Sequence, residues 1–119
     1  MKNIEDEFTP IIDLRKKQEE LLKEAENYRE NGEIANALSS YNDFLNIGER
    51  VKDYSRQHEG YWGMYLTWYT HSKQCKKWSS LVDDLYNRAI LYAPNEKQEE
   101  YKNIYKENQK SFNQEISNK

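Results

Sequence analysis

One histidine and one cysteine are spaced so that they could act together. His71 and Cys75 are four residues apart, and this step places both side chains on the same face of a helix. There the imidazole could lower the pKa of the thiol and make it a nucleophile. A catalytic thiol also needs a third group that orients the imidazole, and the sequence identifies none. An ordinary helix surface with a partly buried cysteine is therefore the favoured interpretation.

Other motifs of catalysis or cofactor binding do not accompany this pair. The chain has no glycine-rich phosphate loop, no GxSxG turn and no HExxH helix. Its single cysteine cannot form an internal disulfide, and its two histidines are not spaced like zinc ligands. We therefore expect a protein that is not an enzyme and that uses no cofactor and no metal.

Residues 60–78 combine lysines with aromatic side chains and contain no acid. Because bases stack on aromatic rings and lysines attract phosphates, this stretch could bind nucleic acid. Lysines in a last helical turn also stabilise the negative end of the helix dipole, and the chain as a whole is acidic, with a net charge of −3. Nucleic acid is therefore the alternative partner, with this candidate surface: Trp62, Trp68, Lys73, Lys76, Lys77 and Trp78.

Length and composition limit the possible architectures. A chain of 119 residues suits one domain, and its four glycines and two prolines leave long uninterrupted stretches for helices. Ten Tyr and three Trp supply apolar surface where aliphatic residues are scarce. No apolar stretch approaches the ~18 residues of a membrane-spanning helix, and the acidic start MKNIEDEFTP is unlike a signal peptide. We expect a cytoplasmic protein without membrane insertion.

Capping signals and apolar spacing predict two helices in the first half of the chain. Thr9-Pro10 is a typical helix start, because the hydroxyl satisfies one free amide and proline removes another. Asn31-Gly32 is a typical end, since glycine adopts the left-handed conformation at low cost. A second helix is expected from about Glu33 to about Gln57, antiparallel to the first because the connection is short.

Three further helices and no strand are expected in the second half. Residues 61–78 carry aromatic side chains around most of the helical circumference, which predicts a central helix. Ser79 or Ser80 can cap a fourth helix that ends at Pro94. Asn95 offers the N-cap of a fifth, amphipathic helix, and the glutamine three residues later would complete a capping box.

The first two predicted helices share a pattern of small, aromatic and turn residues: Ala25, Tyr28, Gly32, Ala37, Tyr41 and Leu45. This pattern resembles the tetratricopeptide repeat, in which paired helices interlock through such residues. A second unit matches at Tyr86, Ala89, Ile90 and Pro94. Its first helix departs from the pattern, because Thr70 stands where a small residue is usual and Lys77 where the turn glycine is usual.

The resemblance implies an all-α fold of antiparallel helix pairs, stacked as a short tetratricopeptide-like right-handed array of about five helices. Because two units and a cap leave an end exposed, we also expect self-association into a homodimer through an aromatic-bearing face. The implied boundaries are 1–8 for a disordered or frayed N-terminus, 9–116 for a single domain with units at about 18–51 and 63–96 and a cap helix at 95–116, and 117–119 for a tail.

Tetratricopeptide proteins bind partner segments along a groove formed by the first helix of each pair. The acidic and aromatic ends of this groove imply a protein or peptide partner that is basic and partly apolar. We therefore expect a protein–protein interaction module, such as an adaptor, a chaperone or an inhibitor or immunity protein. Carried over residue by residue, the resemblance assigns the groove to Glu19, Leu22, Glu26, Arg29, Glu30, Met64, His71, Tyr101 and Tyr105.

A second resemblance covers only the first half of the chain. Ala37-Leu38-Ser39-Ser40-Tyr41 is similar to a pattern in the second helix of the microtubule-interacting and transport domain, which is an antiparallel three-helix bundle. That resemblance leaves the tryptophan-rich residues 61–78 unexplained. It provides a second alternative function beside nucleic-acid binding.

Overall fold

The computed structural model describes residues 4–117, with side chains described for residues 11–115. Within these residues there are five helices and no strand, which confirms the predicted all-α class. None of these helices is both long and apolar enough to cross a membrane. The helices are α1 (Ile4–Glu30), α2 (Ile34–Arg50), α3 (Gln57–Cys75), α4 (Ser80–Tyr92) and α5 (Asn95–Ser117).

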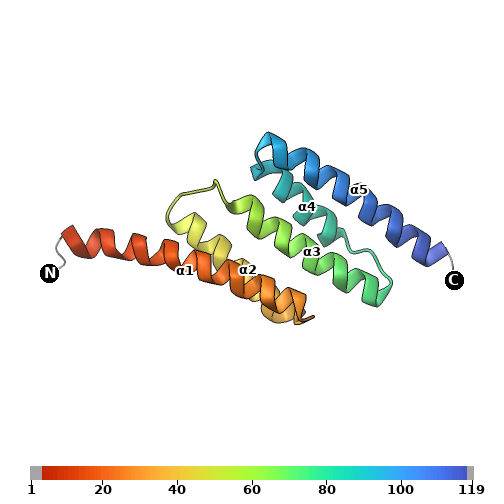
Figure 1. The fold of residues 1–119 in the computed structure, drawn as a ribbon, viewed down its shortest axis with the longest axis horizontal. Helices are drawn as coiled ribbons and strands as arrows, with labels where there is room; N and C mark the ends of the chain where they lie inside the picture. Colours follow the sequence, from red (N-terminus) through yellow and green to blue (C-terminus); the bar gives the residue numbers. More distant parts are fainter. Residues whose placement is uncertain (1–3, 118–119) are drawn as a thin grey trace.

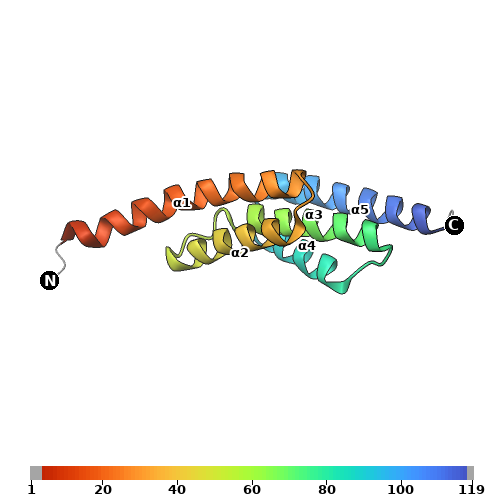
Figure 2. The same ribbon diagram turned by 90° about the horizontal axis from the view of Figure 1, so that it is seen from below.

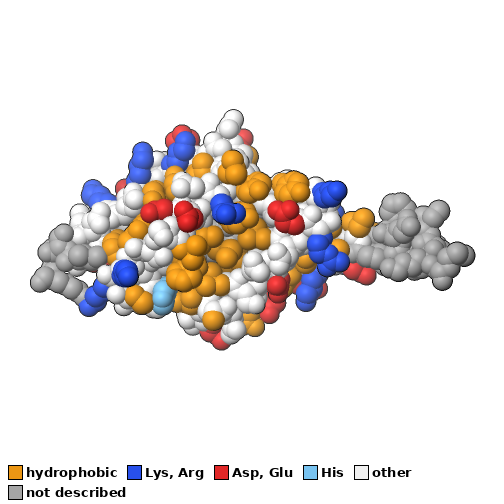
Figure 3. Space-filling view, turned by 180° about the vertical axis from the view of Figure 1, so that it is seen from behind, with side chains coloured by type: hydrophobic (Ala, Val, Ile, Leu, Met, Phe, Trp, Pro, Cys, Tyr) orange, Lys and Arg blue, Asp and Glu red, His pale blue; other side chains and the backbone are white. Residues whose placement is uncertain are grey.

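Consecutive helices run back and forth along an elongated body (Figure 1). The molecule measures 65 × 30 × 19 Å, and its two ends lie at opposite ends of the long axis. Figure 2 shows α1 and α5 along one side, α2 and α4 along the other, and α3 between them. The first half of α1 extends beyond the other helices. From behind, hydrophobic side chains cover the centre of the surface (Figure 3).

The start of α1 differs from the prediction. The helix begins at Ile4 instead of Thr9-Pro10, so Pro10 lies inside it. Proline has no amide hydrogen, and the helix therefore continues there without the backbone hydrogen bond to Asp6. Residues 4–8 contain no glycine or proline that would stop a helix. Residues 1–3 and 118–119 lie outside the described residues.

The boundary between α2 and α3 also differs from the prediction. The second helix ends at Arg50, seven residues before the expected Gln57. Lys52 adopts a left-handed conformation with φ 54°, and the Asp53 carboxylate then accepts a hydrogen bond from the backbone N–H of Ser55. Such side-chain contacts favour turns over helix. Residues 57–59 consequently form the first turn of α3.

The two helix pairs turn in the same way. In the first pair Gly32 is left-handed, with φ 78°, and the amide of Glu33 donates to the carbonyl of Tyr28. In the second pair Lys76 is left-handed, with φ 59°, and the amide of Lys77 donates to the carbonyl of Ser72. The residue equivalent to the turn glycine is therefore Lys76, and the prediction of Lys77 was off by one. Accordingly α3 ends at Cys75 instead of Trp78.

The structure decides between the two predicted caps of α4 and corrects the cap of α5. Ser79 is the N-cap, and its hydroxyl accepts a hydrogen bond of 3.2 Å from the amide of Leu81. Gln98 does not complete a capping box. Its side-chain amide donates instead to the carbonyls of Ile90 and Ala93, at 3.1 and 3.2 Å, and ties the start of α5 to the end of α4.

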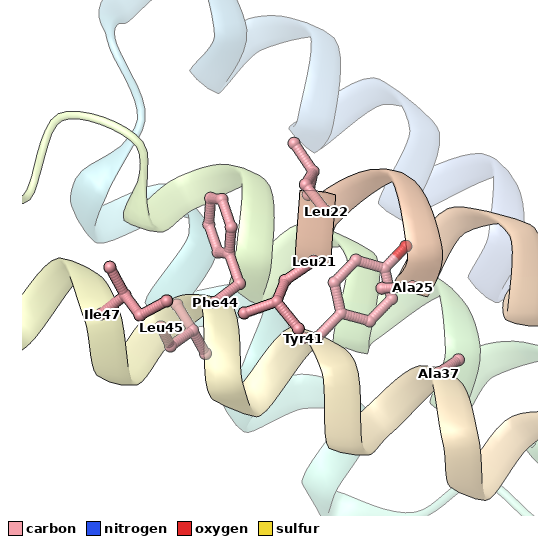
Figure 4. Packing of buried hydrophobic residues seen from close by; sticks show 8 residues of the cluster. All are labelled: Leu21, Leu22, Ala25, Ala37, Tyr41, Phe44, Leu45 and Ile47. Carbon is pink, nitrogen blue, oxygen red and sulfur yellow. The ribbon is translucent and has the colours of Figure 1, made fainter. Parts of the chain in front are cut away.

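The first core cluster lies between α1 and α2 (Figure 4). Two of its rings, on α2, also approach the backbone of α3 closely, because α3 has glycines at the points of contact. A Cβ at Gly60 would come within 2.9 Å of the Phe44 ring, and one at Gly63 would overlap the ring of Tyr41. The members of the cluster are Leu21, Leu22, Ala25, Ala37, Tyr41, Phe44, Leu45 and Ile47.

Aromatic side chains hold α5 against the second helix pair. Tyr105 stacks on Tyr86 with 3.8 Å between ring centres, and its hydroxyl donates to the carboxylate of Asp83. The indole N–H of Trp78 donates to the same carboxylate oxygen at 3.0 Å. Asn108 adds a hydrogen bond of 2.8 Å to the hydroxyl of Tyr65. The last helix is therefore attached through rings and their polar groups.

Candidate functional site

A pocket of about 210 Å³ opens between α1, α3 and α5, and we call it the α1–α3–α5 pocket. The first helix of each pair contributes to it, together with the last helix and one tyrosine of α2. Its lining residues are Glu26, Arg29, Tyr41, His58, Glu59, Trp62, Gly63, Leu66, Lys97, Glu100 and Tyr101.

Tyr41 forms one wall of the pocket because Gly63 leaves space for its ring. The ring is 1% exposed, and its hydroxyl accepts a hydrogen bond of 3.0 Å from Nε of Arg29. Burial raises the pKa of the Tyr41 phenol, so the hydroxyl stays neutral. The hydrogen bond fixes the Arg29 side chain at the edge of the pocket.

The floor of the pocket joins α3 to α5. Trp62 stacks on Tyr101, with 4.1 Å between ring centres and 12° between planes. The hydroxyl of Tyr101 shares a hydrogen bond of 2.8 Å with Nδ1 of His58. Burial lowers the pKa of His58 and raises that of Tyr101 to about 12, so both groups are neutral near pH 7. The floor is therefore aromatic and uncharged.

Some of the charged side chains that line the pocket are in ion pairs, and others are not. Lys97 pairs with Glu100 at 3.1 Å, and Arg56 pairs with Glu59 at 2.7 Å. Nε of Arg29 is hydrogen-bonded to the neutral hydroxyl of Tyr41, which leaves the positive charge of Arg29 without a counter-ion. Glu26 is exposed, and neither Glu26 nor Arg29 has an ion-pair partner among residues 11–115. A ligand therefore meets both charges at the rim, and the five charged lining residues together carry a net charge of −1.

Only part of the predicted groove comes together in this pocket. Glu26, Arg29 and Tyr101 line it. Glu19 lies nearby in an ion pair with Arg56, and Glu30 is exposed at the end of α1 outside the pocket. The others lie elsewhere: Leu22 in the first core cluster, Met64 between that cluster and the buried rings around Tyr65, Tyr105 in its stack with Tyr86, and His71 near the C-terminal end of α3.

The predicted nucleic-acid surface is divided among different surroundings. Trp62 lines the pocket, whereas Trp78 packs edge-to-face on Phe112 beneath α5. Trp68 is partly buried and meets the ring of His71. Lys73 lies over the ring of Tyr69, and its neighbours Lys76 and Lys77 are exposed in the turn before α4.

The His71 and Cys75 side chains do meet, as their spacing predicted. Nε2 of His71 lies 3.4 Å from Sγ of the exposed Cys75. The other ring contact of His71 is with Trp68, which cannot orient the imidazole as a carboxylate would. Within the described residues, no three His, Cys, Asp or Glu side chains are grouped so that they could hold a metal ion.

Several lining residues were not predicted from the sequence, because the helix boundaries differ from those expected. His58 and Glu59 fell outside the predicted third helix, because that helix was expected to begin at residue 61. Lys97 and Glu100 lie on the first turns of α5, whose contacts with α3 are long-range. One signal was present: Gly60 and Gly63 recur three residues apart inside a helix, which indicates close approach of a neighbouring element.

Comparison with protein-family models, with curated proteins and with solved structures finds no match to this chain.

Proposed function

We propose that this chain is a protein-binding module of the tetratricopeptide type, and that it holds a basic, partly apolar segment of a partner protein in the α1–α3–α5 pocket. The observation that carries the proposal is the lining of this pocket. It combines the first helix of each pair with an aromatic floor and with the carboxylate of Glu26 at the rim. The matching left-handed turns of the two pairs support the repeat relationship.

The size of the pocket favours a peptide over a small-molecule ligand. Pockets for small molecules usually occupy roughly 300–1,000 Å³, whereas this one has about 210 Å³. That volume suits one long side chain with its adjoining backbone. The aliphatic part of a lysine or arginine would lie on Trp62 and Leu66, and its charged end would reach Glu26.

A random-peptide display library, selected on the full-length protein, tests this function. We expect the selected peptides to be enriched in Lys or Arg next to an apolar residue. Glu26→Lys should lower the affinity for these peptides and weaken its dependence on salt, because complementary charges steer association. Glu30→Lys is the matched control, since it reverses a charge one helical turn away on α1, outside the pocket.

Two results would contradict the proposal. One is a selection that yields no basic enrichment. The other is equal affinity in the Glu26→Lys and Glu30→Lys variants, which would place the binding site on another face.

A further inference from the structure

The exposed face of α4 carries a regular stripe of four side chains, which we call the α4 stripe. Leu81, Asp84, Arg88 and Leu91 are all exposed, and they follow one another at steps of three, four and three residues. This is the spacing with which two helices meet along a coiled-coil seam. Leu81 is 38% exposed and Leu91 is 74% exposed, so the two apolar ends of the stripe reach solvent.

A shallow surface hollow lies along the stripe. It is bordered by Asp84, Asn87, Arg88 and Leu91, together with Tyr92. The first four are related as i, i+3, i+4 and i+7, and four residues in this relation form the hole that receives a side chain of a facing helix. Figure 3 shows hydrophobic side chains beside charges of both signs on this side of the molecule.

The α4 stripe is complementary to itself when a second copy of the helix runs antiparallel. With a two-fold axis near position 86, Leu81 of one copy lies opposite Leu91 of the other, and Asp84 lies opposite Arg88. Each pair then occurs twice, because the axis exchanges the two chains. Neither charge has an ion-pair partner among residues 11–115. We propose that the protein forms a two-fold homodimer through α4, with a second copy of this chain as the occupant of the stripe.

Side chains beside the α4 stripe hold Arg88 in place and widen the surface that a second copy would contact. The guanidinium of Arg88 lies over the ring of Tyr61, 5.8 Å from its centre. Tyr92 stacks on Tyr61 at 5.7 Å and on Tyr54 at 6.4 Å. Because α4 has only 13 residues, the interface is small, and small interfaces belong to weak complexes. We therefore expect a weak dimer that dissociates on dilution.

Charge reversal at the two central positions tests the dimer by sedimentation equilibrium of the full chain. Asp84→Arg and Arg88→Asp each create two like-charge pairs across the axis, and each should raise the dimer dissociation constant at least about tenfold. The double variant D84R/R88D restores both opposite-charge pairs and should dimerise like the wild type. Glu107→Lys, an exposed reversal on α5, is the control and should leave the constant unchanged.

Mixing the two single variants gives a second, independent readout. One copy then presents two positive charges and the other two negative charges, so the mixture should form a heterodimer at concentrations at which each variant alone is monomeric. Circular dichroism melting of each variant verifies that it is folded. A monomeric wild type at all accessible concentrations would overturn the proposal. So would single reversals that leave the dimer intact, or folded variants that fail to associate on mixing.

Discussion

Gly63 and Tyr41 determine how closely α2 and α3 approach beside the pocket. A methyl group at position 63 would overlap the Tyr41 ring, whose burial leaves it little space to move. We expect Gly63→Ala to lower the free energy of unfolding by about 1–3 kcal/mol, the usual cost of overpacking. Chemical denaturation followed by circular dichroism measures this loss.

A double-mutant cycle identifies the cause of that loss. Tyr41→Leu removes the overlapping ring, so adding Gly63→Ala to it should cost less than in the wild type. Additive costs in the cycle would mean that the ring does not limit the approach of the helices at this position.

His58 makes stability depend on pH. The unfolded chain takes up a proton near the ordinary pKa of 6.5, whereas burial, helped by Lys97 and Arg56 and opposed by Glu59, lowers the pKa of the folded state. Below pH 6.5 the unfolded state therefore binds more protons, and the free energy of unfolding falls as the pH decreases toward the folded pKa. Denaturation of the wild type and of His58→Gln between about pH 5 and pH 7 should show a smaller slope in the variant. Equal slopes would contradict the assignment to His58.

At the scale of single elements, the N-cap of α4 gives two adjacent serines different roles. The hydroxyl of Ser79 accepts the amide of Leu81, whereas Ser80 lies exposed as the first residue of the helix. Ser79→Ala should lower the free energy of unfolding by about 1 kcal/mol, the usual value of an N-cap. Ser80→Ala is the matched control and should be nearly neutral. Thermal melts that rank the two variants in the opposite order would show that the cap is wrongly placed.

The docking of α5 depends on Asp83, whose carboxylate accepts hydrogen bonds from the indole N–H of Trp78 and from the hydroxyl of Tyr105. Asp83→Ala leaves these two donors without their partner, which is costly where they are shielded from water. We expect faster amide hydrogen exchange in α5 and in the connection between α3 and α4, and unchanged exchange in α1 and α2, because Tyr105 and Trp78 lose their acceptor and the first two helices do not. Uniform acceleration in all helices would instead indicate global destabilisation.

The sequence predicted elements whose signals are local and missed those decided by packing. The turn at Gly32 and a serine cap at position 79 or 80 follow from the chemistry of single residues, and the structure has the turn at Gly32 and the cap at Ser79. The continuation of α1 through Pro10 and the capture of Gln98 by carbonyls of α4 could not be read from local preferences. For Gln98, contacts with α4 overrode the usual role of the capping-box glutamine. At Pro10, α1 continues with the loss of one backbone hydrogen bond.

At the scale of the whole molecule, the candidate site was only partly predictable for the same reason. The tetratricopeptide resemblance named Glu26, Arg29 and Tyr101, which come from helices at opposite ends of the chain and meet in one pocket. It also named Leu22, which is buried in the first core cluster, and Tyr105, which is partly buried in its stack with Tyr86. Which side of a helix faces solvent depends on the neighbouring helices, and here the large aromatic rings decide how α5 lies on α3 and α4.

The α1–α3–α5 pocket and the α4 stripe belong to opposite sides of the body, because α4 lies across the molecule from α1 and α5 (Figure 2). A dimer joined back to back would therefore present two pockets facing outward. A ligand with two binding segments on a sufficiently long linker would gain avidity, since the second segment binds at a high effective concentration. Asp84→Arg should abolish this gain and leave the affinity for a single segment unchanged, which calorimetry with one-segment and two-segment peptides measures.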